Sequence, residues 1–120
     1  MVLVDTSVWI AHFRDGNEHL EKLLLDVEVM CHPFIICELA CGNLKNRREI
    51  LSLLRSLSMA PVVGFDEFLY FVDRYSLMGT GIGFVDVHLL ASAKMAGVPL
   101  WTMDKKLCAA AAEMGLAYLE

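Results

Sequence analysis

The sequence lacks any long apolar run, and this absence excludes a membrane-spanning helix. Its longest uncharged stretch, Tyr75–Val85, contains three glycines and is far shorter than the ~20 apolar residues that a spanning helix needs. A secretory signal is also missing, because Asp5 interrupts the first apolar run and Arg14 and Asp15 close it. We therefore expect a cytoplasmic protein that does not associate with membranes.

Cysteine is sparse, with four residues at Cys31, Cys37, Cys41 and Cys108. A chain without an export signal stays in a reducing compartment, where free thiols are the rule. The spacing of these cysteines around His32 matches none of the common zinc motifs. Cysteines four residues apart on an apolar helix are typically core thiols, so we expect Cys37 and Cys41 in the core.

Positive charge is scarce as well, since 10 Lys and Arg residues face 15 Asp and Glu residues and the net charge is −5. Because phosphate contacts need Lys and Arg, this balance argues at first against a nucleic-acid partner. One local exception is the segment 42–58, where Lys45, Arg47, Arg48 and Arg55 face Glu49 alone. The default interpretation is a solvated helix face, and contact with an RNA backbone is the alternative.

Apolar residues are abundant, at 57% of the 120 residues, compared with roughly 45–50% in an average soluble domain. This surplus predicts one well-filled domain over residues 1–120. Short apolar runs alternate with helical periodicities. Strands are expected at 1–4, 27–32, 59–63, 98–102 and 117–119, and helices at 33–42, 65–78, 85–96 and 104–114 among others. The alternation predicts an α/β fold, a three-layer α/β/α sandwich with a central, mostly parallel sheet.

Four carboxylates lie within or at the end of apolar runs. Asp5 directly follows a predicted strand and Asp104 closes the apolar run that contains another, whereas Glu38 and Asp86 lie in predicted helices. Ligands of open α/β sheets bind outside the carboxyl ends of the strands, so we expect the four acids to converge there. Two carboxylates ~4 Å apart repel by about 4 kcal/mol at an effective dielectric near 20. Such a cluster protonates in part or holds a cation, and an all-oxygen donor set favours Mg²⁺ or Mn²⁺, ions suited to phosphoester chemistry.

Each acid taken alone also has an ordinary structural explanation. Asp5 and Asp104 each precede a predicted helix and are candidate N-caps. Asp86 is a candidate first-turn acid, which the helix dipole favours. Glu38 is the hardest to explain in this way, because a mid-helix acid with apolar neighbours on both sides needs a partner. The four acids together, in this order, are far more specific than any one of them.

Four stretches of the chain resemble the PIN-domain ribonucleases, and within them the VapC-type toxins of toxin–antitoxin pairs. These stretches are Val4–Ile10, Ile36–Ala40, Gly83–Ala93 and Leu100–Leu107. The resemblance implies a metal-dependent endoribonuclease that hydrolyses RNA, with Mg²⁺ or Mn²⁺ as its cofactor, acting as the toxin of a type II pair. It also implies a homodimer and a VapB-like antitoxin whose tail occupies the active-site groove.

Roles for individual residues follow from the same resemblance. It implies that the catalytic and metal-binding cluster is Asp5, Glu38, Asp86 and Asp104. The small hydroxyl residues that accompany such acids match Ser7 and Thr102, which we expect to be supporting residues. Candidate RNA contacts at the rim of the expected cleft are Arg14, Lys105 and Lys106.

Two alternatives belong to other classes of protein. The run Leu3–Ser7 superficially resembles the signature of small aspartic proteases, but those are all-β and the helical periodicities contradict that fold. A PIN-like module that binds RNA or protein without cutting it would be marked by loss of one or more acids, and all four are present. Without these four, 11 acidic residues face 10 basic ones, so the acidity is concentrated at the expected site and the objection to RNA weakens.

Overall fold

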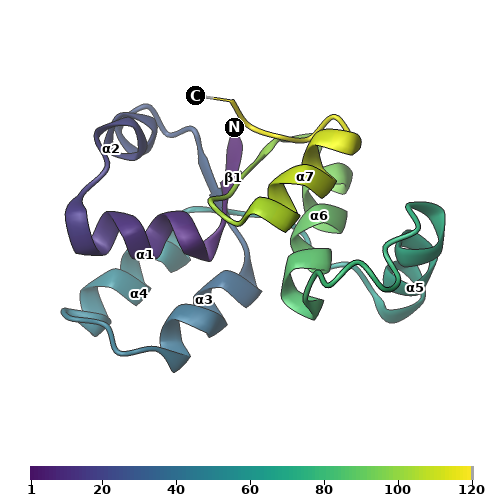
Figure 1. Cartoon of the computed structure of the whole chain (residues 1–120). Coiled ribbons are helices and arrows are strands. Elements are labelled where there is room, and N and C mark those ends of the chain that lie inside the picture. Colours follow the sequence, from purple (N-terminus) through teal and green to yellow (C-terminus); the bar gives the residue numbers. More distant parts are fainter. Residues whose placement is uncertain (120) are drawn as a thin grey trace.

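A four-stranded parallel sheet forms the centre of the computed structural model, which describes residues 1–119 (Figure 1). The strands are β1 (Val2–Val4), β2 (Val29–Cys31), β3 (Ser58–Met59) and β4 (Leu100–Trp101). Their order is β3-β2-β1-β4, and each pairing is parallel. The first strand of the chain is therefore an inner strand, and its carboxyl end lies next to that of the last strand.

Helices cover both faces of this sheet, as the three-layer prediction requires (Figure 1). On one side are α1 (Thr6–Asp15), α2 (Glu18–Leu25), α3 (Pro33–Cys41) and α4 (Arg47–Ser56). On the other side are α5 (Phe65–Arg74), α6 (Phe84–Ala96) and α7 (Lys105–Glu113). The predicted α/β class and the mostly parallel sheet are confirmed.

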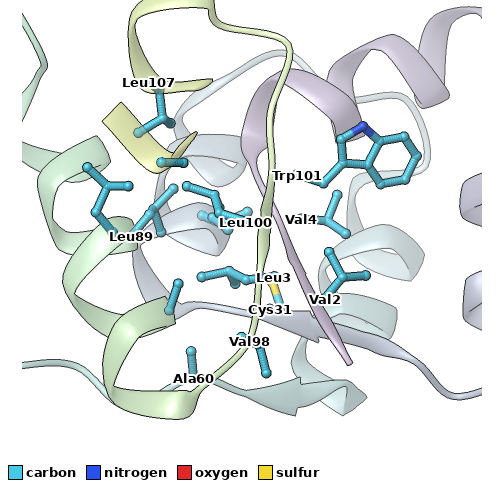
Figure 2. Packing of buried hydrophobic residues seen from close by; sticks show 14 of the residues in the cluster. Val2, Leu3, Val4, Cys31, Ala60, Leu89, Val98, Leu100, Trp101 and Leu107 are labelled. Carbon is cyan, nitrogen blue, oxygen red and sulfur yellow. The ribbon is translucent and has the colours of Figure 1, made fainter. Parts of the chain in front are cut away.

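The core is centred on β1, whose residues are between 0% and 2% exposed. Figure 2 shows Leu3 and Leu100 of adjacent strands beside Leu89 of α6, with Leu107 of α7 nearby. Burial of each such leucine contributes about 1.5–3 kcal/mol relative to an exposed one. This packing fixes the ends of β1, β4 and α6 relative to one another, and those ends carry the predicted acids.

All five predicted strands are shorter than expected, and two of them differ most clearly. The strand expected at 59–63 ends at Met59 because the ladder cannot continue through Pro61, which has no backbone N–H. The strand expected at 117–119 is reduced to one parallel bridge between Ala117 and Leu100. Neither change alters the order of the sheet.

The prediction that Cys37 and Cys41 are core thiols was wrong, because both are exposed. Ile35 and Leu39 form the buried face of α3, and positions two residues away lie on the opposite side of a helix with 3.6 residues per turn. All four cysteines are free thiols. Burial raises the pKa of the Cys31 thiol to about 11, so this residue is an unreactive core side chain.

None of the helices in residues 1–119 combines the length and the apolar character that crossing a membrane would require.

Candidate active site

Asp5 follows β1 directly and is 4% exposed. Its backbone N–H donates to the carbonyl of Trp101 at 2.9 Å, which ties it to β4. The residue occupies the N-cap position of α1, yet its side chain does not cap that helix. Instead, Oδ2 accepts two hydroxyl hydrogen bonds, from Ser7 and from Thr102, both at 2.8 Å. Within residues 1–119, Oδ1 receives no protein donor, so it remains available to a ligand.

The two hydroxyls are themselves fixed by the backbone that follows β4. Ser7 Oγ accepts from the N–H of Met103 and Thr102 Oγ1 accepts from the N–H of Asp104, each at 3.0 Å. Each hydroxyl therefore donates its proton to Asp5 and accepts one hydrogen bond from a backbone N–H. The predicted supporting residues therefore lie where they orient Asp5 and connect the start of α1 to the start of α7.

Asp104 is a genuine N-cap, because its Oδ1 accepts from the N–H of Leu107 at 2.9 Å. The N-cap role that was the structural alternative for Asp104 is therefore correct, but it uses only one of the two carboxylate oxygens. Its other carboxylate oxygen is not used by the cap. Capping thus holds the carboxylate at the carboxyl end of β4, where Asp5 lies on the neighbouring strand.

Asp86 lies in the first turn of α6, where the charges of the other three predicted acids act on it. Its pKa is raised to about 6, first by burial and then by the negative charges of Asp5, Asp104 and Glu38. Charges raise a carboxyl pKa in this way only at short range or through a medium of low polarity. The other three predicted acids are therefore near enough to Asp86 to disfavour its ionised form.

Glu38 and Asp104 are the exposed members of the four predicted acids. A hydrogen bond orients the Glu38 side chain. Its Oε1 accepts from the hydroxyl of Thr6 at 2.7 Å. This contact joins α3 to the first residue of α1, beside Asp5. Thr6 was not predicted from the sequence, although its position directly after Asp5 in the run Asp5–Ser7 was a usable signal.

The donor set suits a hydrated divalent cation. Among residues 1–119, no group of three or more Asp, Glu, His or Cys side chains is placed so that its members alone could hold a metal ion. Mg²⁺ typically keeps several waters and uses only one or two carboxylates, so an open set of acids fits it better than a closed cage would. The oxygen-only chemistry and the negative charges that act on Asp86 therefore fit Mg²⁺ or Mn²⁺.

The predicted RNA contacts are exposed near this cluster. Arg14 forms an ion pair with Asp15 at 2.9 Å and lines a groove that also contains Glu38 and Lys45. Lys105 and Lys106 follow Asp104 in the first turn of α7. Lys106 lies over the loop that precedes α6, since a Cβ at Gly81 would be 2.9 Å from its Nζ.

Comparison with known proteins agrees with this geometry. A sequence model of the PIN domain matches residues 2–113. The chain belongs to the PIN-domain family. Ribonuclease VapC32 of Mycobacterium tuberculosis, from two strains, is 51% identical to this PIN domain over 121 residues, with 100% of this chain and 98% of the relative covered.

Solved structures show the same fold at low sequence identity. The crystal structure of PAE2754 from Pyrobaculum aerophilum superposes with a TM-score of 0.67 at 20% identity, covering 91% of this PIN domain and 83% of that chain. The structure of FitAB bound to a DNA fragment gives 0.62 at 18% identity, covering 100% and 98%. The resemblance on which the site residues were assigned is therefore confirmed at the level of family and fold.

Proposed function

We propose that this PIN domain is a Mg²⁺- or Mn²⁺-dependent endoribonuclease that hydrolyses RNA phosphodiester bonds as the toxin of a type II toxin–antitoxin pair. The observation that carries the proposal is the buried Asp5 carboxylate, which accepts hydrogen bonds from two hydroxyls and whose charge, with those of Asp104 and Glu38, raises the pKa of Asp86. The ribonuclease name of the 51% identical relative supports the same reaction.

In the proposed mechanism, Asp5, Asp86 and Asp104 are the principal metal ligands, directly or through water. Glu38, which Thr6 orients, would hold a second ion or position water for attack. Ser7 and Thr102 keep one oxygen of Asp5 occupied and leave the other for the ligand. The bound ion supplies charge stabilisation at the phosphate and a more acidic water.

The function is tested by sequencing the ends of cellular RNA after controlled expression of the chain. We expect new RNA ends at a limited set of sites with the natural sequence and none with a variant that lacks Asp5. Purified protein should cut the same RNA with Mg²⁺ or Mn²⁺ and not in excess chelator. Binding without any new ends would instead identify a PIN-like binding module that does not cut.

Glu38 provides a prediction about metal use. Thr6→Val removes the hydroxyl that holds Glu38, so the Mg²⁺ concentration for half-maximal cleavage is expected to rise about tenfold, in the range seen when outer-shell partners of metal ligands are removed. Thr6→Ser keeps the hydroxyl and is expected to behave like the natural chain. The measurement is the cleavage rate of an RNA oligonucleotide against Mg²⁺ concentration. An identical Mg²⁺ dependence for all three proteins would contradict this role.

We also propose a homodimer, and an apolar patch beside the cleft suits a second copy. The patch consists of Phe34, Cys37, Cys41, Phe84 and Val85, which line one hollow together with Glu38. The Phe84 ring is 63% exposed and stacks on Phe34 at 6.2 Å between centroids. Exposed apolar patches next to a functional cleft typically mark interaction surfaces.

Phe84→Glu is expected to shift the chain from dimer to monomer, because it places a charge in the apolar patch that the dimer would bury. Leu25→Glu is the matched control, because Leu25 is 84% exposed at the end of α2. Sedimentation velocity distinguishes a dimer from a monomer for each variant. A Phe84→Glu protein that sediments with the mass of the natural chain would locate the interface elsewhere.

A VapB-like antitoxin is the proposed protein partner, on the strength of the similarity to VapC32. The groove beside Glu38 has apolar walls that include Ile10, Phe13 and Leu39. An extended tail with apolar residues for this groove and a basic residue for the four carboxylates would block the cleft.

A further inference from the structure

The outer face of α4 and the loop before it carry Lys45, Arg47, Arg48 and Arg55, which we call the α4 basic face. We propose that the α4 basic face binds backbone phosphates of an unpaired stretch of the RNA substrate, away from the scissile bond. The proposal rests on the proposed function, and it adds an RNA-binding surface distinct from the lysines at the rim of the cleft.

The charge of the chain makes this face unusual. It holds 4 of the chain's 10 Lys and Arg residues, and Glu49 is the one acid in segment 42–58, although the net charge is −5. All four basic side chains are exposed. Within residues 1–119 none of them takes part in an ion pair. The face is therefore an uncompensated positive surface, which is the main electrostatic requirement for binding a phosphate backbone.

The placement of two of the arginines argues against a role in helix stability. Arg47 and Arg48 open α4, and the first turn of a helix already carries partial positive charge. Basic residues there are unfavourable by about 0.3–1 kcal/mol each, whereas acidic residues would stabilise the helix. Arg47 is partly explained, since its Nη2 donates to the carbonyl of Ala40 at 2.7 Å and ties α4 to the end of α3. Arg48 makes no such bond to the part of the chain that the structure describes.

The geometry suits a chain of phosphates. Arg48, Ser52 and Arg55 are spaced by four and three residues, which places them in a row along one side of α4. They line a shallow surface hollow together with Arg47 and Leu51. A row of two guanidinium groups with a hydroxyl between them offers charged donors that can bind phosphate oxygens bidentately.

The start of α4 separates this row from the proposed cleft. The groove that contains Glu38 also contains Arg14, Lys45 and Asn46, and Asn46 immediately precedes α4. Ile50 of α4 also lines this groove and lies two residues from Arg48 and Ser52, so the row is on the other side of the helix. An RNA strand with its scissile phosphate at the acids therefore has to cross the start of α4, past Lys45 and Asn46, to reach Arg48 and Arg55. Positive charge along this path also offsets the repulsion between the phosphates and the four carboxylates, which extends over about a Debye length of 8–10 Å.

The test measures binding in a protein that does not cut. In an Asp5→Asn background, the pair Arg48→Ala and Arg55→Ala is compared with the pair Lys22→Ala and Lys94→Ala. The control pair removes the same charge from exposed positions on α2 and α6. A fluorescently labelled single-stranded RNA of mixed sequence is titrated at several salt concentrations, and its anisotropy gives Kd.

For the α4 pair we expect Kd to rise about tenfold or more at low salt. The slope of log Kd against log salt should fall by about 1.4, or about 0.7 for each phosphate that is no longer neutralised. The control pair should change Kd and the salt slope by much less. Replacing Arg48 and Arg55 by Lys keeps the charge and should keep most of the affinity.

Equal effects of the two alanine pairs, or no effect of either, would overturn the proposal. So would unchanged RNA affinity together with weaker binding of an acidic protein partner. A chain that cuts no RNA would fail the proposed function separately, because cleavage is measured on the natural sequence and binding on the inactive variant.

Discussion

Asp5→Asn is expected to abolish Mg²⁺- or Mn²⁺-dependent RNA cleavage, with a loss of about 10³-fold or more. A metal ion contributes several kcal/mol of stabilisation to the charge that develops on a phosphate, and each 1.36 kcal/mol is a factor of ten in rate. Asp5 is the most buried of the four acids and the one that two hydroxyls orient. Losing its negative charge therefore removes the ligand on which the arrangement of the cleft depends.

The same change is expected to leave the fold intact. Asn has the shape of Asp and keeps one oxygen that can accept from Ser7 and Thr102, so the cost is about 1 kcal/mol. The measurement pairs cleavage of an RNA oligonucleotide with thermal unfolding. Asp73→Asn, which removes one exposed acid from α5, is the matched control and should cut normally. Full activity of Asp5→Asn, or undiminished activity of the natural chain in excess chelator, contradicts the site.

Asp86→Asn is expected to remove cleavage and, at the same time, to stabilise the metal-free protein at neutral pH. In the folded chain the pKa of Asp86 is about 6, above its ordinary value of 3.8. The folded state therefore holds a proton between these values that the unfolded state has lost. The stability contributed by this group is fully present below about pH 4 and is lost as the pH rises through 6.

The expected gain from Asn at pH 7 is about 1–2 kcal/mol. One pKa unit corresponds to 1.36 kcal/mol, and the full shift is discounted because Asp86 is only partly buried and solvent screens its charge. Thermal unfolding in chelator at pH 5 and pH 7 measures it, with Asp66→Asn on α5 as the control for loss of one exposed acid. Added Mg²⁺ should raise the melting temperature of the natural chain and not that of Asp86→Asn. An Asp86→Asn protein that melts below the natural chain at pH 7 would show that the carboxylate is satisfied by the protein itself.

Much of the cleft was predictable because it follows from topology. Asp5 and Asp104 each come directly after a short apolar run, and parallel strands bring their carboxyl ends to one edge of a sheet. The hydroxyls of Ser7 and Thr102 lie two residues from those acids, so the same rule places them nearby. Sheet order was enough to bring the two acids together, whereas the supporting roles of Ser7 and Thr102 were implied by the resemblance to PIN-domain ribonucleases.

Other features depend on packing between elements that are distant in sequence. The bond from Thr6 to Glu38 forms only because α1 and α3 lie together on one face of the sheet. The exposure of Cys37 and Cys41 was not predictable for a related reason. Almost every residue of α3 is apolar, so its periodicity does not distinguish the buried side, and its neighbours decide which face the core takes.

The pairing of β1 with β4 has a consequence for the time at which the proposed toxin becomes harmful. The hydrogen bond from Thr102 to Asp5 joins residues 97 positions apart. Interactions of such long range form late in folding, because a long loop must close first. A chain still under synthesis, with residues before Leu100 alone outside the ribosome, has an open edge on β1, no hydroxyl from Thr102 and no Asp104. While the chain is still being synthesised, its cleft is therefore incomplete and inactive. An antitoxin can bind the emerging chain during this time.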